Sequence, residues 1–118
     1  MKYKATVTAI GDFAMQLMQV RDSIIIFDKD VPYAYANMVI SHTKSDLKED
    51  PVIGDQLIMA DREYKIIDIG EDAVKNLRDR GHVTLVFNEN RKAEMPGEII
   101  LSGDKVPRVM VGDTIEIF

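Results

Sequence analysis

The chain contains no cysteine among its 118 residues. This absence excludes disulfide bonds, a thiolate nucleophile and the cysteine ligands of a typical structural zinc site. It is compatible with a reducing compartment, and we expect a cytoplasmic protein. The two histidines and scattered carboxylates such as Asp46 and Asp79 do not have the spacing of metal ligands, so we expect neither a metal nor a cofactor.

Long apolar runs and an excess of basic residues are also missing. No run approaches the roughly 20 apolar residues of a membrane span, and the residues after Met1 enter a strand pattern without the apolar segment of a secretion signal. The formal net charge of −5 and the pI of about 4.9 argue against nucleic-acid binding, which needs a basic face. An acidic surface suits a basic protein partner instead.

The sequence does contain an internal repeat. A chain of 118 residues with 46% hydrophobic content can form one core, so we expect a single domain, residues 1–118, built jointly by the halves 1–60 and 61–118. The matched segments are residues 3–12 and 64–71, 23–27 and 83–87, 38–41 and 99–102, and 53–59 and 111–117. In this alignment His42 falls opposite Gly103, and a difference of this kind in a duplicated scaffold marks a candidate functional site.

Short apolar runs between turn residues predict a mainly β protein. The expected strands cover residues 3–10, 23–27, 38–41, 56–59, 64–69, 82–87, 98–101 and 114–118. One short helix is expected in each half. The first covers residues 12–20 with Asp12 as its N-cap, and the second covers residues 71–80 and ends before Gly81.

Two Gly-Asp pairs indicate how the halves combine. Gly54 and Gly112 are expected to adopt a positive φ in tight turns, which Asp55 and Asp113 stabilise with side-chain hydrogen bonds. Two separate β units would leave sheet edges exposed, whereas one closed pseudo-two-fold barrel of interleaved halves removes them. The paired turns resemble those of the cradle-loop barrels. We therefore expect a small closed β-barrel.

His42 is the leading candidate for chemistry. It follows an expected strand and precedes the polar loop 44–50, so we expect its ring at the surface, where a neutral imidazole is a competent nucleophile. Ser41, Thr43 and Lys44 could donate hydrogen bonds to an anion bound there. The alternative is an ordinary exposed histidine in a loop whose serine and threonine satisfy local backbone groups.

His82 is the second candidate. It could orient or support His42 electrostatically, with positive charge added by Arg78 and Arg80. Alternatively it only begins a strand, while the arginines complement the C-terminus of the preceding helix.

The segments around His82 resemble a known family. Residues 77–87 contain the stretch Gly-His-Val-Thr-Leu, and residues 93–97 read Ala-Glu-Met-Pro-Gly. Together they resemble the glucitol/sorbitol-specific IIA component of the phosphoenolpyruvate-dependent sugar phosphotransferase system, and the resemblance extends over essentially the whole chain.

This resemblance implies a phosphotransferase that works through a phosphohistidine. A histidine at the position of His42 would accept a phosphoryl group from the phosphocarrier protein HPr and pass it to a cysteine of the IIB component during glucitol or sorbitol uptake. Ser41, Thr43, Lys44 and His82 are then the candidate phosphoryl-binding residues. Any membrane association would be indirect, through the permease.

Other functions stay open. The chain could be a non-catalytic β-barrel that binds partners or forms a homodimer, in which His42 is incidental. Tyr33, Tyr35 and Met38 could form an adaptable apolar rim for a protein partner. Binding of a small molecule in the mouth of the barrel has only the fold class in its favour.

Overall fold

Buried and exposed side chains alternate along the first strand. The computed structural model describes residues 1–118. In β1 (Tyr3–Ile10) the side chains of Tyr3, Ala5 and Val7 are buried. Lys4 and Thr8, at alternate positions, are exposed. Because successive side chains of a strand point to opposite faces, this pattern directs one face of β1 into the core.

Ten further elements follow β1. They are α1 (Ala14–Arg21), β2 (Ser23–Asp28), the 3-10 helix η1 (Tyr33–Met38), β3 (Val39–His42), β4 (Gln56–Met59), β5 (Arg62–Ile69), α2 (Ala73–Arg80), β6 (Val83–Val86), β7 (Glu98–Gly103) and β8 (Thr114–Ile117). All the expected strands are present, with ends shifted by a few residues. The 3-10 helix η1 was not predicted. Neither helix is long and apolar enough to cross a membrane.

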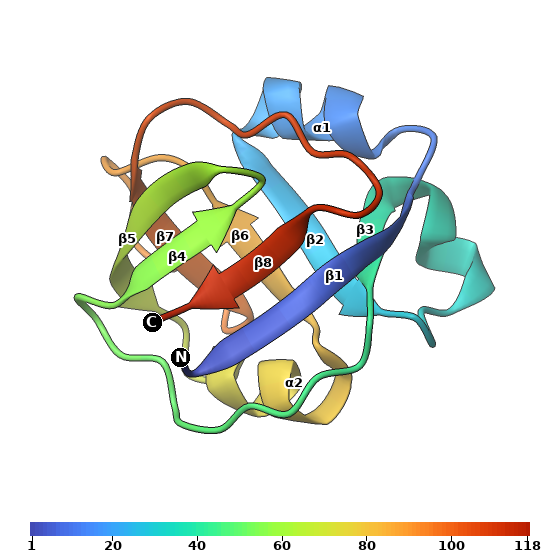
Figure 1. Cartoon of the computed structure of the whole chain (residues 1–118). Helices are drawn as coiled ribbons and strands as arrows, with labels where there is room; N and C mark the ends of the chain where they lie inside the picture. The colour runs from blue at the N-terminus through green and yellow to red at the C-terminus, as the bar shows by residue number, and fades with distance from the viewer.

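The strands form one closed barrel in the order β1-β3-β2-β6-β7-β5-β4-β8 (Figure 1). The order confirms that the halves interleave, because β4 from the first half lies between β5 and β8 of the second. The last strand, β8, in turn pairs with β1, which brings the two ends of the chain side by side. Each half contributes one parallel pair, β2 with β3 and β6 with β7.

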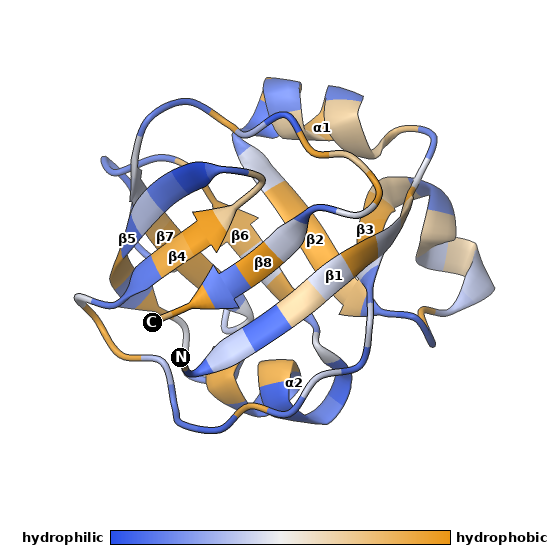
Figure 2. Cartoon of the chain, in the orientation of Figure 1, coloured by the Kyte–Doolittle hydropathy of each residue, from blue (hydrophilic) through white to orange (hydrophobic).

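The barrel interior is the hydrophobic core. The strands carry most of the hydrophobic residues, whereas the segment between β3 and β4 is mostly hydrophilic (Figure 2). Large side chains that are fully buried come from both halves: Tyr3, Met18, Ile26, Ile40, Leu57, Met59, Ile66, Leu77, Leu85, Ile99, Ile100 and Leu101. One core is therefore shared by both halves.

The strand registers show which residues of the two halves correspond. β1 pairs with β3 through Val7 and His42, and β5 pairs with β7 through Ile66 and Leu101. Both ladders shift register directly after these pairs, so the two pairs occupy the same position. His42 thus corresponds to the core residue Leu101. The sequence alignment with Gly103 was wrong, because Gly103 lies further along, at the end of β7.

The helices begin later than predicted. The N-cap of α1 is Phe13 and not Asp12, and no side chain caps either helix. Ala14 and Ala73 instead donate backbone hydrogen bonds to the carbonyls of Gly11 and Gly70, so a turn precedes each helix. Both helices end in a residue of left-handed conformation, Asp22 after α1 and Gly81 after α2, and only the end at Gly81 was predicted.

The two Gly-Asp turns confirm the prediction made for them. Gly54 and Gly112 have φ values of 101° and 97°. The Oδ2 atom of Asp55 accepts a hydrogen bond from the Val52 N–H, and Oδ2 of Asp113 accepts one from the Met110 N–H. The turn at Asp55 has one extra interaction, since Lys2 Nζ lies 2.7 Å from the same carboxylate.

This extra ion pair predicts a pH-dependent stability. Burial disfavours the charged form of Asp55, but the Lys2 ammonium and the Val52 N–H outweigh it and lower the pKa of Asp55 below its ordinary value of 3.8. A lowered carboxyl pKa stabilises the folded protein at pH values well above 3.8, and this contribution is lost as the pH falls through the folded-state pKa. Asp55→Asn should therefore reduce the free energy of unfolding at pH 7, and the difference from wild type should shrink in acid.

Urea unfolding at pH 7 and near pH 3 measures this difference. Asp113→Asn is the matched control, because the amide can still accept the turn hydrogen bond and no lysine is paired with Asp113. The ion-pair account is wrong if Asp113→Asn shows the same pH dependence as Asp55→Asn.

Candidate functional site

The ring of His42 lies inside the barrel. His42 is the last residue of β3 and is 0% exposed. Its side chain shares a face with that of Ile40, which belongs to the core, because residues two apart in a strand point the same way. The expectation of an exposed ring was wrong, since β3 extends to His42 and pairs with β1 on one side and β2 on the other.

Both ring nitrogens of His42 contact backbone carbonyls. Nδ1 lies 2.8 Å from the oxygen of Thr43, and Nε2 lies 2.8 Å from the oxygen of Gly81, which belongs to the other half of the chain. A neutral imidazole has one N–H, so only a doubly protonated ring can donate to both oxygens at once. A neutral ring with a free lone pair on Nε2 therefore requires the Gly81 carbonyl to withdraw.

Gly81 is the C-cap of α2 and packs directly on this ring. A Cβ atom at Gly81 would lie 2.4 Å from Cε1 and 2.9 Å from Nε2 of His42. Its φ of 58° does not by itself demand glycine, because Asp22, the C-cap of α1, has a φ of 55°. We conclude that the absence of a side chain at Gly81 makes room for the imidazole.

A polar pocket of about 270 Å³ adjoins the covered ring. It is lined by Tyr3, Asp28, Lys44, Ser45, Asp46, Arg78, Asp79 and Gly81. Its two cations are already paired, Lys44 with Asp30 and Arg78 with Asp50. The lining thus offers hydrogen-bond donors but no surplus of positive charge.

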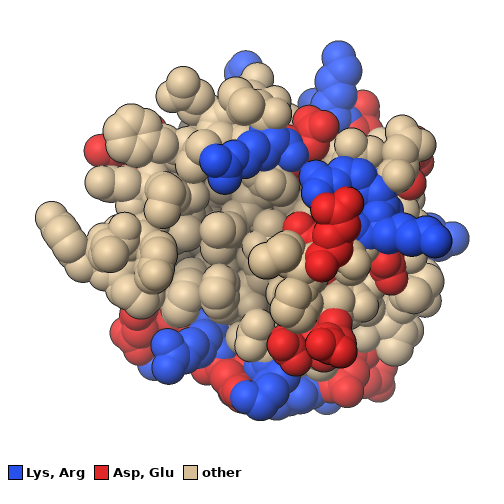
Figure 3. All heavy atoms as spheres, turned by 180° about the vertical axis from the view of Figure 1, so that it is seen from behind, with Lys and Arg blue, Asp and Glu red and all other residues tan.

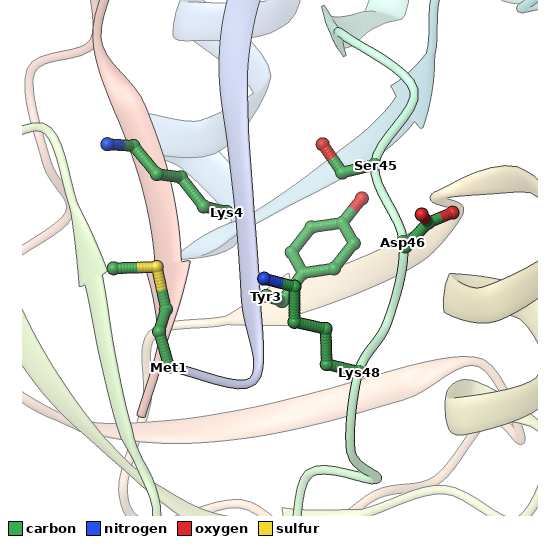
Figure 4. A pocket seen from close by; sticks show the side chains of 6 residues that line it. All are labelled: Met1, Tyr3, Lys4, Ser45, Asp46 and Lys48. Atoms are coloured by element: carbon green, nitrogen blue, oxygen red, sulfur yellow. The ribbon is translucent and has the colours of Figure 1, made fainter.

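Tyr3, Ser45 and Asp46 also line a second, smaller hollow of about 200 Å³. Figure 4 shows the Tyr3 hydroxyl pointing from β1 toward the segment that carries Ser45 and Asp46. The Tyr3 ring meets the His42 ring edge-on, with the ring centroids 6.3 Å apart and the planes at 88°. Burial and the carboxylate of Asp28 raise the pKa of Tyr3 to about 12, so the hydroxyl keeps its proton at neutral pH.

Of the three neighbours considered around His42, only Lys44 reaches the pocket. Ser41 is buried, and the alternation of β3 points it away from the face of His42. The hydroxyl of Thr43 accepts a hydrogen bond from the backbone N–H of Thr6, 3.0 Å away. Thr43 contributes through its carbonyl instead, which holds the imidazole.

His82 lies outside this pocket. Its ring stacks on Phe27 with centroids 4.5 Å apart, and the two line a separate apolar groove of about 350 Å³. Burial, and to a smaller extent the charge of Arg80, lower the pKa of His82. A ring kept neutral in this way does not supply positive charge to an anion.

Sequence reasoning missed Tyr3, Asp28 and Gly81 as parts of the site. The repeat offered a signal for Gly81: the equivalent position in the first half, at the end of α1, is Asp22, so the two halves differ there. No pattern pointed to Tyr3 or Asp28, which come from β1 and the end of β2. No group of three or more histidine or acidic side chains is arranged to hold a metal ion.

Comparison with known proteins identifies the family. Residues 2–116 match the family described as the PTS system glucitol/sorbitol-specific IIA component. The chain belongs to this family. Curated members from Escherichia coli (strain K12) and Shigella flexneri are each 28% identical to it over 114 residues, which cover 97% of this chain and 92% of the relative.

A solved structure shows the same fold. The PTS system IIA component from Enterococcus faecalis V583 superposes with a TM-score of 0.85 over 96% of this chain and 97% of its own, at 24% identity. As a IIA component the chain is a phosphotransferase, a phosphocarrier of the sugar phosphotransferase system. Its partners are an upstream phosphocarrier and a IIB component.

The contact between Gly81 and His42 yields a prediction. Alanine at a positive φ lowers the free energy of unfolding by about 1–2 kcal/mol relative to glycine. Gly54→Ala should show this cost alone, because nothing lies within 4 Å of the new Cβ. Gly81→Ala should cost more, because the new methyl group overlaps the His42 ring, and it should displace that ring. Urea unfolding measures the stability of each variant, and ¹⁵N shifts of the His42 ring report the displacement.

Gly54→Ala is the control for backbone strain alone and should leave the His42 shifts as in wild type. Unchanged ring shifts in Gly81→Ala would contradict the packing role of Gly81.

Proposed function

We propose that His42 carries the phosphoryl group, accepts it from phospho-HPr, and passes it to a cysteine of the IIB component during glucitol or sorbitol uptake. The observation that carries the proposal is the position of its Nε2 atom, which lies under the Gly81 carbonyl at the border of the polar pocket. The other histidine, His82, is stacked on Phe27 in the apolar groove. HPr and the carrier would meet in the cytoplasm.

The attacking atom in this proposal is Nε2. In this proposal Nδ1 donates its hydrogen to the Thr43 carbonyl, and the lone pair of Nε2 becomes free once the Gly81 carbonyl withdraws. As the bond from Nε2 to phosphorus forms, the bond from phosphorus to the HPr histidine breaks. The positive charge passes from the donor imidazole to the ring of His42, whose Nδ1–H stays on the Thr43 carbonyl. No net proton transfer is needed, and the exchange between two histidines is nearly balanced.

The covered state of His42 requires a movement before transfer. The Gly81 carbonyl occupies the line of approach to Nε2, so the end of α2 has to withdraw when a partner docks. In the resting protein the same contact keeps the nucleophile away from other phosphoryl donors and from water. The charges of the pocket fit a transient carrier, because Asp28, Asp46 and Asp79 oppose tight retention of a dianion that Lys44 and Arg78 attract.

The partner surface is the apolar groove that begins beside Gly81. It is lined by Ile25, Phe27, Tyr35, Met38, Val39 and His82. Figure 3 shows the back of the molecule, on the side of η1 and β2, as a broad area of uncharged atoms with charges at its margin. HPr is the proposed occupant, because Asp28 and Gly81 of the phosphoryl pocket directly follow and precede the groove residues Phe27 and His82.

A labelling experiment tests the phosphoryl site. Incubation with phosphoenolpyruvate, enzyme I and HPr should label the wild-type protein in an acid-labile, alkali-stable form. His42→Gln should abolish the label, because it removes the nucleophilic nitrogen, and His82→Gln should retain at least part of it. Scintillation counting after acid and alkali treatment measures each outcome.

Failure of the wild-type protein to take up label would favour the non-catalytic alternative. A fully buried histidine bonded through both nitrogens is also what a purely structural histidine looks like. The barrel would then be a module for protein interaction or dimerisation.

The docking surface has its own test. Tyr35→Asp places a charge in the apolar groove and should lower kcat/KM for transfer from phospho-HPr by about fivefold or more, because a buried interface charge disfavours association. Rapid-quench measurement of labelling gives this rate. Val111→Asp, an exposed apolar position outside the groove, is the control and should transfer at the wild-type rate. Equal rates for the two variants would exclude the groove as the HPr surface.

A further inference from the structure

One buried hydroxyl group in this protein has no hydrogen-bond partner. The hydroxyl of Tyr3 is shielded from solvent, and no protein acceptor is within reach. The hydroxyl of Tyr64, also on a barrel strand, donates to the carbonyl of Lys105 at 2.7 Å. An unpaired buried hydroxyl costs stability, so its presence calls for an explanation.

The position of Tyr3 beside Gly81 and His42 explains why its hydroxyl is unpaired. The point that a Cβ atom of Gly81 would occupy lies 3.3 Å from the Tyr3 hydroxyl oxygen and 2.9 Å from Nε2 of His42. Gly81 therefore covers both atoms together. A withdrawal of the Gly81 peptide would open one space bordered by a ring nitrogen and a phenolic O–H.

We propose that Tyr3 donates its hydroxyl hydrogen bond to an oxygen of the phosphoryl group on His42. This inference rests on the proposed phosphorylation of His42. The phosphoryl group presents three strong acceptor oxygens, and a donor without another partner adds stabilisation only in the phosphorylated state.

The fold holds this donor in place. Tyr3 pairs with Ile117 of β8 in the ladder that closes the barrel, and its ring packs edge-on against the His42 ring. Such a fixed O–H loses little freedom when it meets an acceptor, in contrast to the flexible side chains of Lys44 and Arg78.

Tyr3→Phe tests the role, because it removes only the hydroxyl. The unphosphorylated variant should melt at or above the wild-type temperature, since an unpaired buried group is lost. Its equilibrium constant for phosphoryl exchange with phospho-HPr, measured by ³¹P NMR, should fall about tenfold or more, the usual effect of losing a hydrogen bond to a charged group.

Tyr64→Phe is the matched control and should behave in the opposite way. It loses a hydroxyl that is already paired, so its melting temperature should fall while its exchange equilibrium stays at the wild-type value. A wild-type equilibrium in Tyr3→Phe, whatever its melting temperature, would overturn the role of Tyr3. In that case labelling of wild-type His42 would leave the proposed function intact, whereas an unlabelled wild type would remove both.

Discussion

The exchange of the final strand of each half is the constraint on which the rest of the structure depends. β4 pairs with β5 and β8, and β8 pairs with β1 and β4. Without these pairings, β1 and β5 would be open sheet edges and neither half could enclose a core. Closure also fixes the end of the barrel at which Tyr3, the last residue of β3 and the end of α2 meet. The site is thus a consequence of how the halves close each other.

The site departs from the symmetry of this scaffold at two positions. Where the second half has Leu101 in the core, the first has His42, and where the first half ends its helix with Asp22, the second has Gly81. The substitutions complement each other, because a buried imidazole needs polar partners and the missing side chain at Gly81 brings a carbonyl to it. The equivalent carbonyl, of Asp22, accepts an ordinary backbone bond from Phe87.

Gly81 covers the proposed nucleophile, His42. An exposed phosphohistidine site would be ready at all times, whereas the proposed site on His42 would be reached only after Gly81 moves. The groove beside His82 offers a reason for such a movement, since a partner seated there would contact the residue next to Gly81. Docking and uncovering would then be coupled through a single peptide. The proposed hydrogen bond from Tyr3 would favour the uncovered state once the phosphoryl group is in place.

The sequence by itself determined the local elements and the family. Period-two alternation, the Gly-Asp turns and the end of α2 at Gly81 are local properties. The stretch around His82 carried the resemblance that the comparisons confirmed. Asp12 does not cap α1, and the Ala14 N–H donates to the carbonyl of Gly11 instead. Only the tertiary structure decided that His42 faces inward, that it corresponds to Leu101, and that Tyr3 and Gly81 surround it. The reason is physical: the face of a strand depends on its register with its neighbours, and the contacts of His42 come from residues far from it in the chain.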